Sequence, residues 1–243
     1  MQALVITGGG RGIGARVALG AARRGCRMAL GYQTNRARAE AVVAEVARLG
    51  GQAVAFPMEL ADEASIVRFF AESDRALGPF DGLVNSGGII GPHGRIDAVP
   101  GAGLAELMAI NVTGTFLCCR EAIRRMSTKH GGNGGAIVNL GSAASRLGGA
   151  GENVPYAASK GAVDSLTFGL AQEVAGEGIR VNAVSPGVID TEIQPPGRVE
   201  RVGPNLPMKR VGRPEEVAEA ILWLLSDAAS YVSGAVLNVS GGR

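Results

Sequence analysis

A glycine-rich turn directly after the first apolar segment constrains the fold more than any other feature of this chain. The segment Ala3–Thr7 predicts a buried strand, and Gly8–Gly14 then places five glycines before a helical pattern begins. Glycines let the chain turn sharply off a strand and let its backbone lie close to a diphosphate. The free N–H groups of the following helix would face that anion. This arrangement is typical of a dinucleotide site, and a Walker site is excluded because no Gly-Lys-Ser/Thr follows.

Short apolar runs alternate with helix-periodic stretches along the whole chain. The runs are rich in Val, Ile and Leu and mostly lack polar alternation, which is typical of parallel strands buried on both faces. The expected strands are Ala3–Thr7, Met28–Tyr32, Ala53–Phe56, Gly82–Asn85, Ala136–Leu140, Arg180–Ser185 and Ala235–Val239. Between them, Asp62 is expected to cap one helix and Pro214 to begin another. Repeated βα units predict one doubly wound α/β domain over residues 1–243, with a mainly parallel sheet and helices on both faces.

Composition excludes several classes of protein. The formal net charge is only +2, so we expect neither a nucleic-acid partner nor attraction to anionic lipid. The cysteines Cys26, Cys118 and Cys119 are odd in number and lack the spacing of a disulfide framework. No signal-peptide pattern precedes the first strand, and no apolar run approaches the ~18 residues that span a bilayer. We therefore expect a cytoplasmic protein without a membrane partner or a metal site.

One segment, Val188–Arg213, differs from the rest because it is rich in Pro and Gly and carries several charges. It predicts a mobile substrate loop, since loops of this length are often lids. Its run Arg198–Arg201, with Lys209 and Arg210, is expected on a solvated lid surface, although one such residue would suit an anionic substrate. The histidines His93 and His130 lie in loops without a metal-ligand partner at suitable spacing. Trp223 is expected in a helix core or an oligomer contact.

The residues after the second predicted strand bear on the choice of cofactor. An acid there suits the ribose hydroxyl of NAD, whereas basic residues suit the 2′-phosphate of NADP. The stretch Gly31–Arg38 holds no acid before Glu40, Arg11 lies within the glycine turn, and Arg36 is close in sequence. NADP(H) is therefore favoured, with NAD(H) as the alternative. Arg38 also suits a solvated helix face.

Four polar residues suggest acid–base chemistry. Tyr156 and Lys160 are four residues apart, so on a helix they share one face, and a nearby ammonium favours phenolate over phenol. Such a phenol can protonate a carbonyl oxygen as hydride arrives, or deprotonate an alcohol in reverse. Ser142 follows the fifth strand, at the sheet edge where ligands bind in such folds. Asn111 lies in a helical stretch that Asn does not favour, so we expect a specific role for it.

These motifs together resemble the short-chain dehydrogenase/reductase family, from Met1 to Arg243. The turn Thr7–Gly14 matches the family's Thr-Gly-x-x-x-Gly-Ile-Gly, and Pro186-Gly187 with Thr191 matches its segment near the nicotinamide carboxamide. The quartet Asn111, Ser142, Tyr156 and Lys160 matches the family's active site. The resemblance implies a seven-stranded Rossmann-type domain, usually in a homodimer or homotetramer. It also implies that Tyr156 is the acid/base, that Lys160 holds the nicotinamide ribose and favours phenolate, that Ser142 orients substrate, and that Asn111 anchors a water in a proton relay towards Lys160.

Cofactor contacts are expected on the same basis. They are Gly8, Gly10, Arg11, Gly12, Ile13, Gly14, Tyr32, Gln33, Thr34, Asn35, Glu59, Leu60, Asn85, Gly87, Tyr156, Lys160, Pro186, Gly187, Ile189 and Thr191. The chain departs from the family pattern in three places. Asn85-Ser86-Gly87-Gly88 replaces Asn-Asn-Ala-Gly, Glu59 replaces an Asp near the adenine, and Ser240-Gly241-Gly242 replaces Asp-Gly-Gly. None of these departures affects the quartet.

The function expected from this pattern is hydride transfer between a nicotinamide and a small-molecule carbonyl/alcohol pair. A 3-oxoacyl-type reductase and a sugar or polyol dehydrogenase both remain open. A non-catalytic NADP-binding sensor needs the glycine turn but not the quartet, so the intact quartet disfavours it. An epimerase or dehydratase on this scaffold normally has a larger C-terminal substrate region, for which 243 residues leave little room.

Overall fold

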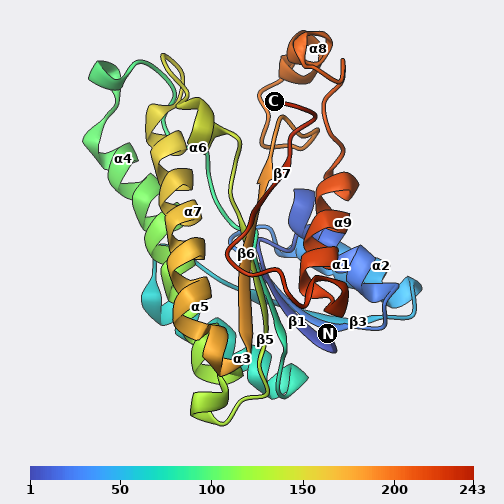
Figure 1. Ribbon diagram of the computed structural model, residues 1–243. Helices are drawn as coiled ribbons and strands as arrows, with labels where there is room; N and C mark the ends of the chain where they lie inside the picture. Colours follow the sequence, from blue (N-terminus) through green and yellow to red (C-terminus); the bar gives the residue numbers. More distant parts are fainter.

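The computed structural model describes residues 1–243 and contains a seven-stranded sheet in which every neighbouring pair is parallel (Figure 1). The strands are β1 (Ala3–Thr7), β2 (Arg27–Tyr32), β3 (Gln52–Pro57), β4 (Gly82–Asn85), β5 (Gly135–Leu140), β6 (Ile179–Pro186) and β7 (Val236–Val239). Their order is β3-β2-β1-β4-β5-β6-β7. The predicted doubly wound α/β fold is confirmed.

Each predicted strand is present, but several ends differ by one residue. Arg27 and Gln52 belong to β2 and β3 because their backbones pair with each other, although their side chains are polar. Gly135 and Ile179 likewise pair at the start of β5 and β6, whereas Ala235 lies outside β7. Backbone pairing sets where a strand ends, while an apolar pattern reports only which side chains are buried.

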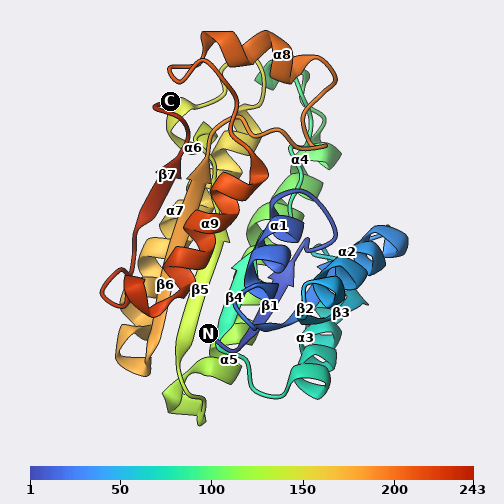
Figure 2. The same ribbon diagram turned by 90° about the vertical axis from the view of Figure 1, so that its right-hand side faces the viewer.

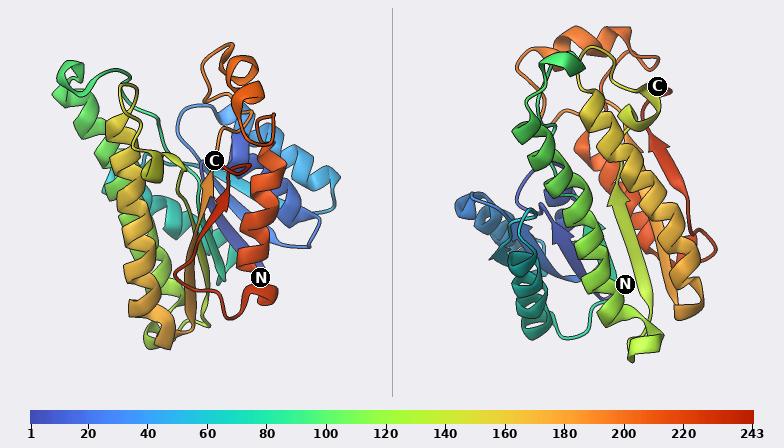
Figure 3. Two further views of the ribbon diagram at one scale, coloured as in Figure 1. Left: turned by 45° about the horizontal axis from the view of Figure 1, so that its top comes forward. Right: turned by 90° about the vertical axis from the view of Figure 1, so that its left-hand side faces the viewer.

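Helices cover both faces of the sheet. They are α1 (Gly12–Ala22), α2 (Arg36–Arg48), α3 (Glu63–Leu77), α4 (Gly101–Met108), α5 (Gly114–Met126), α6 (Ala144–Leu147), α7 (Val154–Val174), α8 (Arg198–Val202) and α9 (Pro214–Leu225). Figure 2 shows α1, α2 and α9 in front of one face, and the right-hand view of Figure 3 shows α3, α4, α5 and α7 in front of the other. Pro214 begins α9, as its sequence predicts.

Two apolar cores, one on each face, explain the continuous hydrophobicity of the strands. In β1, Leu4 and Ile6 pack with α1 and α9, while Ala3 and Val5 pack with α3, α5 and α7. All four are fully buried. Because successive side chains of a strand point to opposite faces, a strand between two helical layers needs apolar residues at every position. Burying each large aliphatic side chain stabilises the folded state by about 1.5–3 kcal/mol.

A π-helical turn, Ala109–Thr113, joins α4 and α5 into one continuous helix of 26 residues, Gly101–Met126. An 18-residue stretch of this helix has a mean hydropathy of 1.4, so by length and composition alone the helix could cross a membrane, and the expectation of no such segment is corrected. The extra length arises because the π turn carries the helix through Asn111. In the fold, Cys118 and Met126 are buried against the sheet, so the C-terminal half of this helix is a core helix.

The segment Val188–Arg213 lies over the carboxyl edge of the sheet and contains more regular structure than its sequence suggests (Figures 1 and 2). It includes α8 and a 3₁₀ turn, Gly203–Asn205. Its two ends are joined by a bridge between Ile189 and Gly212, and the Gly212 N–H donates to the Val188 carbonyl at 2.9 Å. We refer to this segment below as the lid; its mobility stays a prediction.

The N-terminal cap of α3 can be tested by mutation. The Asp62 carboxylate accepts a hydrogen bond from the Ala64 N–H at 3.0 Å. Asp62→Ala is expected to lower the free energy of unfolding by about 1 kcal/mol, because a donor of the first turn loses its partner. Asp62→Asn, which keeps an accepting oxygen, is the control and is expected to stay near wild type. Urea unfolding measures both, and equal losses in the two variants would contradict the capping role.

Candidate active site

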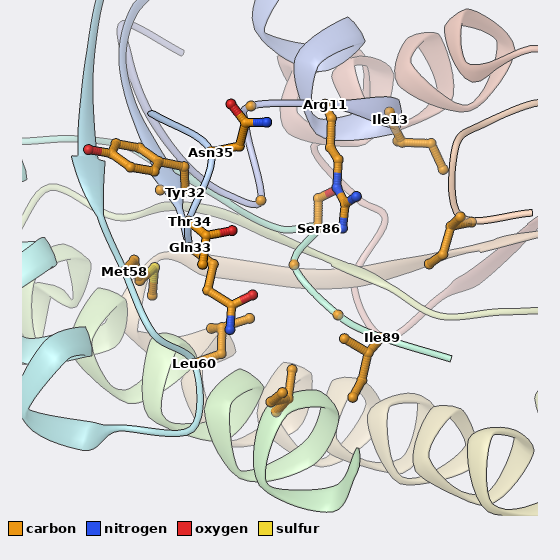
Figure 4. A pocket seen from close by; sticks show the side chains of 18 of the residues that line it. Arg11, Ile13, Tyr32, Gln33, Thr34, Asn35, Met58, Leu60, Ser86 and Ile89 are labelled. Carbon is orange, nitrogen blue, oxygen red and sulfur yellow. The ribbon is translucent and has the colours of Figure 1, made fainter. Parts of the chain in front are cut away.

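The site lies where the strand order reverses. From β1, the chain adds β2 and β3 on one side and then β4 to β7 on the other. The segments that leave β1 and β4 therefore diverge, and a crevice opens at the carboxyl ends of these strands. A cavity of about 340 Å³ occupies this position (Figure 4).

Most of the expected cofactor residues line this cavity. Those that do are Gly8, Gly10, Arg11, Gly12, Ile13, Tyr32, Gln33, Thr34, Asn35, Glu59, Leu60, Gly87 and Thr191. Those that do not are Gly14, Asn85, Tyr156, Lys160, Pro186, Gly187 and Ile189. Asn85 differs from the expectation for a clear reason: its amide is buried and donates to the Asn139 side chain at 2.9 Å, so it joins β4 to β5.

Sequence reasoning missed several lining residues. These are Gly31, Arg38, Met58, Ser86, Gly88, Ile89, Ile110, Leu140, Glu192 and Ile193. Most of them stand at or just beyond the carboxyl end of a strand, next to a residue that was expected. Their place after a strand was therefore the available signal, whereas Ile110 enters only because the π turn brings its helix to the cavity.

Glycine is required in the first turn because two backbone segments touch there. Gly8 has a φ of +65°, and a Cβ atom on it would lie 2.8 Å from the Gly87 Cα atom. A Cβ atom on Gly14 would lie 2.4 Å from the Gly8 carbonyl oxygen. Helix α1 begins at Gly12 with no side-chain cap and no acid in its first turn. Its N–H groups and its dipole thus favour an anion, which fits the diphosphate of a dinucleotide.

Two arginines reach the cavity, and one of them was not the arginine expected. Figure 4 shows the Arg11 side chain extending into the cavity towards Ser86. Arg36 instead pairs with Glu40 at 2.6 Å on the outer face of α2. Arg38, two residues further round the helix, lines the cavity and pairs with Glu192 of the lid. The helical rotation of α2 therefore decides which arginine can meet a ligand.

The expected adenine end of the cavity carries a paired carboxylate. The Gln33 amide donates to Glu59 Oε2 at 2.6 Å, and the Ala61 N–H donates to Glu59 Oε1 at 3.1 Å. Both oxygens of Glu59 thus have partners in the protein. The longer side chain of Glu59, compared with the Asp of the family pattern, is held by Gln33 rather than left free to repel a phosphate.

Tyr156, Lys160 and Ser142 come together beside the cavity. Burial raises the pKa of Tyr156, and the neighbouring Ser142 hydroxyl lowers it. Lys160 follows one turn later on α7, with its Nζ atom 5.8 Å from the centroid of the Tyr156 ring. Lys160 Nζ donates to the Leu140 carbonyl at 2.7 Å. The carboxyl end of β5 therefore holds both Ser142 and the lysine.

Burial lowers the pKa of Lys160 to about 8, with a nearby carboxylate, Asp164, acting in the opposite direction. The ammonium form of Lys160 favours the phenolate form of Tyr156, because opposite charges attract at short range in a buried site. Burial alone favours the neutral form of both groups. The charged forms of Tyr156 and Lys160 thus depend on partners that offset the loss of water.

Asn111 lies in the π turn and holds the segment that follows β4. Its Oδ1 accepts from the Ile89 N–H at 2.9 Å, and its Nδ2 donates to the Ile89 carbonyl at 2.8 Å and to Ser159 Oγ at 3.2 Å. Its own carbonyl accepts from Thr115 Oγ1 at 2.8 Å. The side chain therefore positions the cavity wall, a role that the sequence did not indicate.

Other candidate groups take no place in this chemistry. The cysteines are free and buried, and burial raises the pKa of Cys119 to about 12, which makes its thiol a poor nucleophile. No cluster of three or more ligating side chains is present. Trp223 is 41% exposed and therefore not a core residue. Arg198, expected in solvent, is only 19% exposed and pairs with Glu152 at 3.5 Å.

Comparison with known proteins gives relatives over essentially the whole chain. A family model described as enoyl-(acyl carrier protein) reductase matches residues 8–243. An uncharacterized oxidoreductase, YgfF, of Escherichia coli (strain K12) is 48% identical and covers 100% of both chains. The L-rhamnose 1-dehydrogenase (NAD(P)(+)) of Azotobacter vinelandii is 35% identical, covering 99% of this chain and 96% of its own. A human 3-oxoacyl-[acyl-carrier-protein] reductase is 36% identical, covering 98% and 95%.

Solved structures agree with this grouping. A short-chain dehydrogenase/reductase from Serratia marcescens has a TM-score of 0.92 and 32% identity, covering 99% of this chain and 97% of its own. A short chain dehydrogenase from Burkholderia cenocepacia, in complex with NADP, has a TM-score of 0.92 and 30% identity with the same coverage.

The glycine contact predicts the effect of one added methyl group. Gly8→Ala is expected to weaken NADPH binding at least about tenfold, because the new Cβ displaces Gly87 at the cavity wall. Gly25→Ala is the matched control: its φ of +75° imposes similar backbone strain, but no atom lies within 4 Å of the new Cβ. Fluorescence titration with NADPH compares them. Equal affinities for the two variants would show that the contact with Gly87 does not shape the site.

Proposed function

Because the chain belongs to the short-chain dehydrogenase/reductase family, an oxidoreductase family acting on CH–OH groups, we propose that it is an NADP(H)-dependent enzyme that interconverts a carbonyl and a secondary alcohol. Residues 1–243 form one NAD(P)-binding domain in this proposal. The observation that carries it is the convergence of Tyr156, Ser142 and Lys160 beside a cavity built from the glycine turn. A non-catalytic NADP-binding sensor would need the cavity but would have no use for these three side chains beside it.

The proposed chemistry assigns one task to each side chain. The nicotinamide, when bound, supplies or accepts the hydride. The Tyr156 phenol donates its proton to the substrate oxygen in reduction and accepts it in oxidation. The Ser142 hydroxyl orients the substrate oxygen towards the phenol. The Lys160 ammonium stabilises the phenolate, and burial strengthens this attraction because little water competes.

Lys160 and Asn111 also suggest how the proton is replaced. Lys160 Nζ makes one hydrogen bond, to the Leu140 carbonyl, which leaves two of its donors for the ribose and for water. We propose that Asn111 anchors a water between itself and Lys160. In support, Gly88 lies between them: a Cβ atom on it would be 3.0 Å from Asn111 Oδ1 and 3.9 Å from Lys160 Nζ.

NADP(H) is the proposed cofactor, with NAD(H) as the alternative. Arg11 and Arg38 line the cavity, and both of its carboxylates have partners: Glu59 is paired with Gln33, and Glu192 with Arg38. A 2′-phosphate would therefore meet guanidinium groups, Arg11 above all, rather than a free acid. The Burkholderia structure is described in complex with NADP, and the Azotobacter relative is named for both cofactors.

A 3-oxoacyl-type compound is the first substrate class to test, because the family model and the human relative carry acyl-carrier names. The alternative is a sugar or polyol, after the name of the Azotobacter relative. A screen of 3-oxoacyl thioesters, other ketones and sugars, followed by the absorbance of the reduced nicotinamide, separates the two. Turnover of none of these with either cofactor would contradict the proposal.

We also propose a cytoplasmic homo-oligomer, with a tetramer as the favoured form. Its support is a set of large apolar side chains in solvent on three helices: Phe116 on α5 is 47% exposed, Phe168 on α7 is 61% exposed, and Trp223 on α9 is 41% exposed. Exposed apolar groups of this size are typical of contacts between subunits. Free, buried cysteines suit the reducing cytoplasm.

The role of Tyr156 predicts a specific loss. Tyr156→Phe is expected to lower kcat by at least about 100-fold, the range of general acid–base catalysis, while NADPH affinity stays within a few-fold. Tyr231→Phe is the control, because it removes the same hydroxyl from a tyrosine that is fully exposed. Steady-state rates and fluorescence titration measure both effects. Near-normal turnover in the Tyr156 variant would remove its assigned role.

The role of Arg11 predicts a change in cofactor preference. Arg11→Ala is expected to weaken NADPH binding by about tenfold and to leave NADH binding unchanged, because only NADPH carries the 2′-phosphate. Arg36→Ala is the matched control: Arg36 is close in sequence but pairs with Glu40 outside the cavity. Similar losses for both cofactors, or a loss in the Arg36 variant, would contradict the assignment.

A further inference from the structure

Asp164 is a partly buried carboxylate that neither the fold nor the proposed chemistry has yet explained. It lies on α7 one turn after Lys160, on the same side of the helix. Its Oδ1 atom is shielded from solvent and has no hydrogen-bond partner. Burial raises the pKa of Asp164, whereas Ser145, Lys160 and Arg146 lower it. Placing a carboxylate there is costly, so the position calls for a reason other than stability.

Glycine at position 141 makes room for this carboxylate. The backbone of Gly141 is not left-handed, so its conformation does not require glycine. A Cβ atom there would nevertheless lie 2.9 Å from Asp164 Oδ1 and 3.3 Å from the Val184 carbonyl oxygen. The same Cβ position is 3.8 Å from the Cα of Ser185, whose buried hydroxyl also lacks a partner. The end of β5 is thus built to admit Asp164 beside polar groups.

The charges around Lys160 are few. Its own helix contributes Tyr156 and Asp164, and α6 contributes Arg146, which attracts Asp164. The strand β5 offers the Leu140 carbonyl, and the segment after β4 offers backbone and amide groups. Asp164 is therefore the acidic group that opposes the effect of burial on the lysine.

Gly141 and Ser145 place this carboxylate beside the segment that carries Ser142. A Cβ atom on Gly141, the residue before Ser142, would lie 2.9 Å from Asp164 Oδ1. The Ser145 hydroxyl donates to the Ser142 carbonyl at 2.9 Å, and Ser145 also lowers the pKa of Asp164. The carboxylate is thus adjacent both to the lysine and to the segment that carries the serine.

We propose that Asp164 is a positioning residue of the active site, whose carboxylate keeps Lys160 as an ammonium ion beside Tyr156. It acts through Lys160 and touches neither substrate nor cofactor. The inference rests on the proposed function only for its catalytic consequence, since the effect on the lysine is a property of the protein itself.

The lysine content of the chain allows a direct test. Its lysines are Lys129, Lys160 and Lys209, so NMR of lysine labelled with ¹³C at Cε gives one signal from each. Lys160 is expected to titrate near pH 8 in the wild type, where burial holds its pKa. In Asp164→Asn it is expected to titrate about 1 pH unit lower, because the opposing charge is gone. The exposed Lys129 and Lys209 serve as internal references.

Glu173→Gln is the matched control. Glu173 is an exposed carboxylate on α7, and it lies thirteen residues, or about 20 Å, along the helix from Lys160. The Glu173→Gln substitution changes the net charge by the same amount as Asp164→Asn and is expected to leave the Lys160 titration unchanged. If Asp164→Asn is poorly folded, Asp164→Ser removes the same charge with a smaller side chain. Titration of Lys160 at the wild-type pH in the Asp164 variant would overturn the proposal.

Kinetics give a second readout. In Asp164→Asn the alkaline limb of kcat is expected to move to lower pH together with the lysine titration, because the neutral amine no longer favours phenolate. A merely structural role would lower kcat at every pH without moving the limb, and that result would overturn the proposal. Since the NMR titration needs no substrate, a shifted lysine in a protein without turnover would count against the proposed function alone.

Discussion

The close approach of two backbone segments, at Gly8 and Gly87, is the constraint on which the rest of the site depends. It occurs where the strand order reverses, so the turn after β1 and the segment after β4 touch at their start and then diverge. The crevice between them becomes the cavity, and the first turn of α1 presents free N–H groups to it. A Cβ atom on Gly8 would lie 2.8 Å from the Gly87 Cα atom, so a side chain at this position would push the two segments apart.

Helix α7 resolves a second conflict, between burial and charge. Burial favours the neutral forms of Tyr156 and Lys160, whereas the proposed acid–base role needs their charged forms to be accessible. The Ser142 hydroxyl opposes this effect of burial at Tyr156, and the carboxylate of Asp164 opposes it at Lys160. Tyr156, Lys160 and Asp164 follow one another at intervals of four residues. One face of α7 therefore carries the tyrosine, the lysine and the carboxylate that opposes the effect of burial on the lysine.

The segments that the sequence described poorly are those whose conformation depends on distant partners. Asn111 breaks the helical pattern, yet the chain remains helical there because a π turn accommodates it and Ile89 satisfies its side chain. Arg36 and Arg38 are equally basic neighbours, and only the rotation of α2 separates the one in the cavity from the one in solvent. Arg198 is drawn out of solvent by Glu152, forty-six residues away in sequence.

The order of the βα units, the seven strands, the glycine turn and the shared helix face of Tyr156 and Lys160 could all be predicted from the chain alone. This was possible because burial on both faces of a sheet, and spacing along one helix, are local constraints that leave a pattern in the residues. Which polar groups meet could be learned from the folded protein alone. The approach of Ser142 to Tyr156, of Asp164 to Gly141 and of Glu59 to Gln33 joins residues from separate elements, and packing in three dimensions sets those distances.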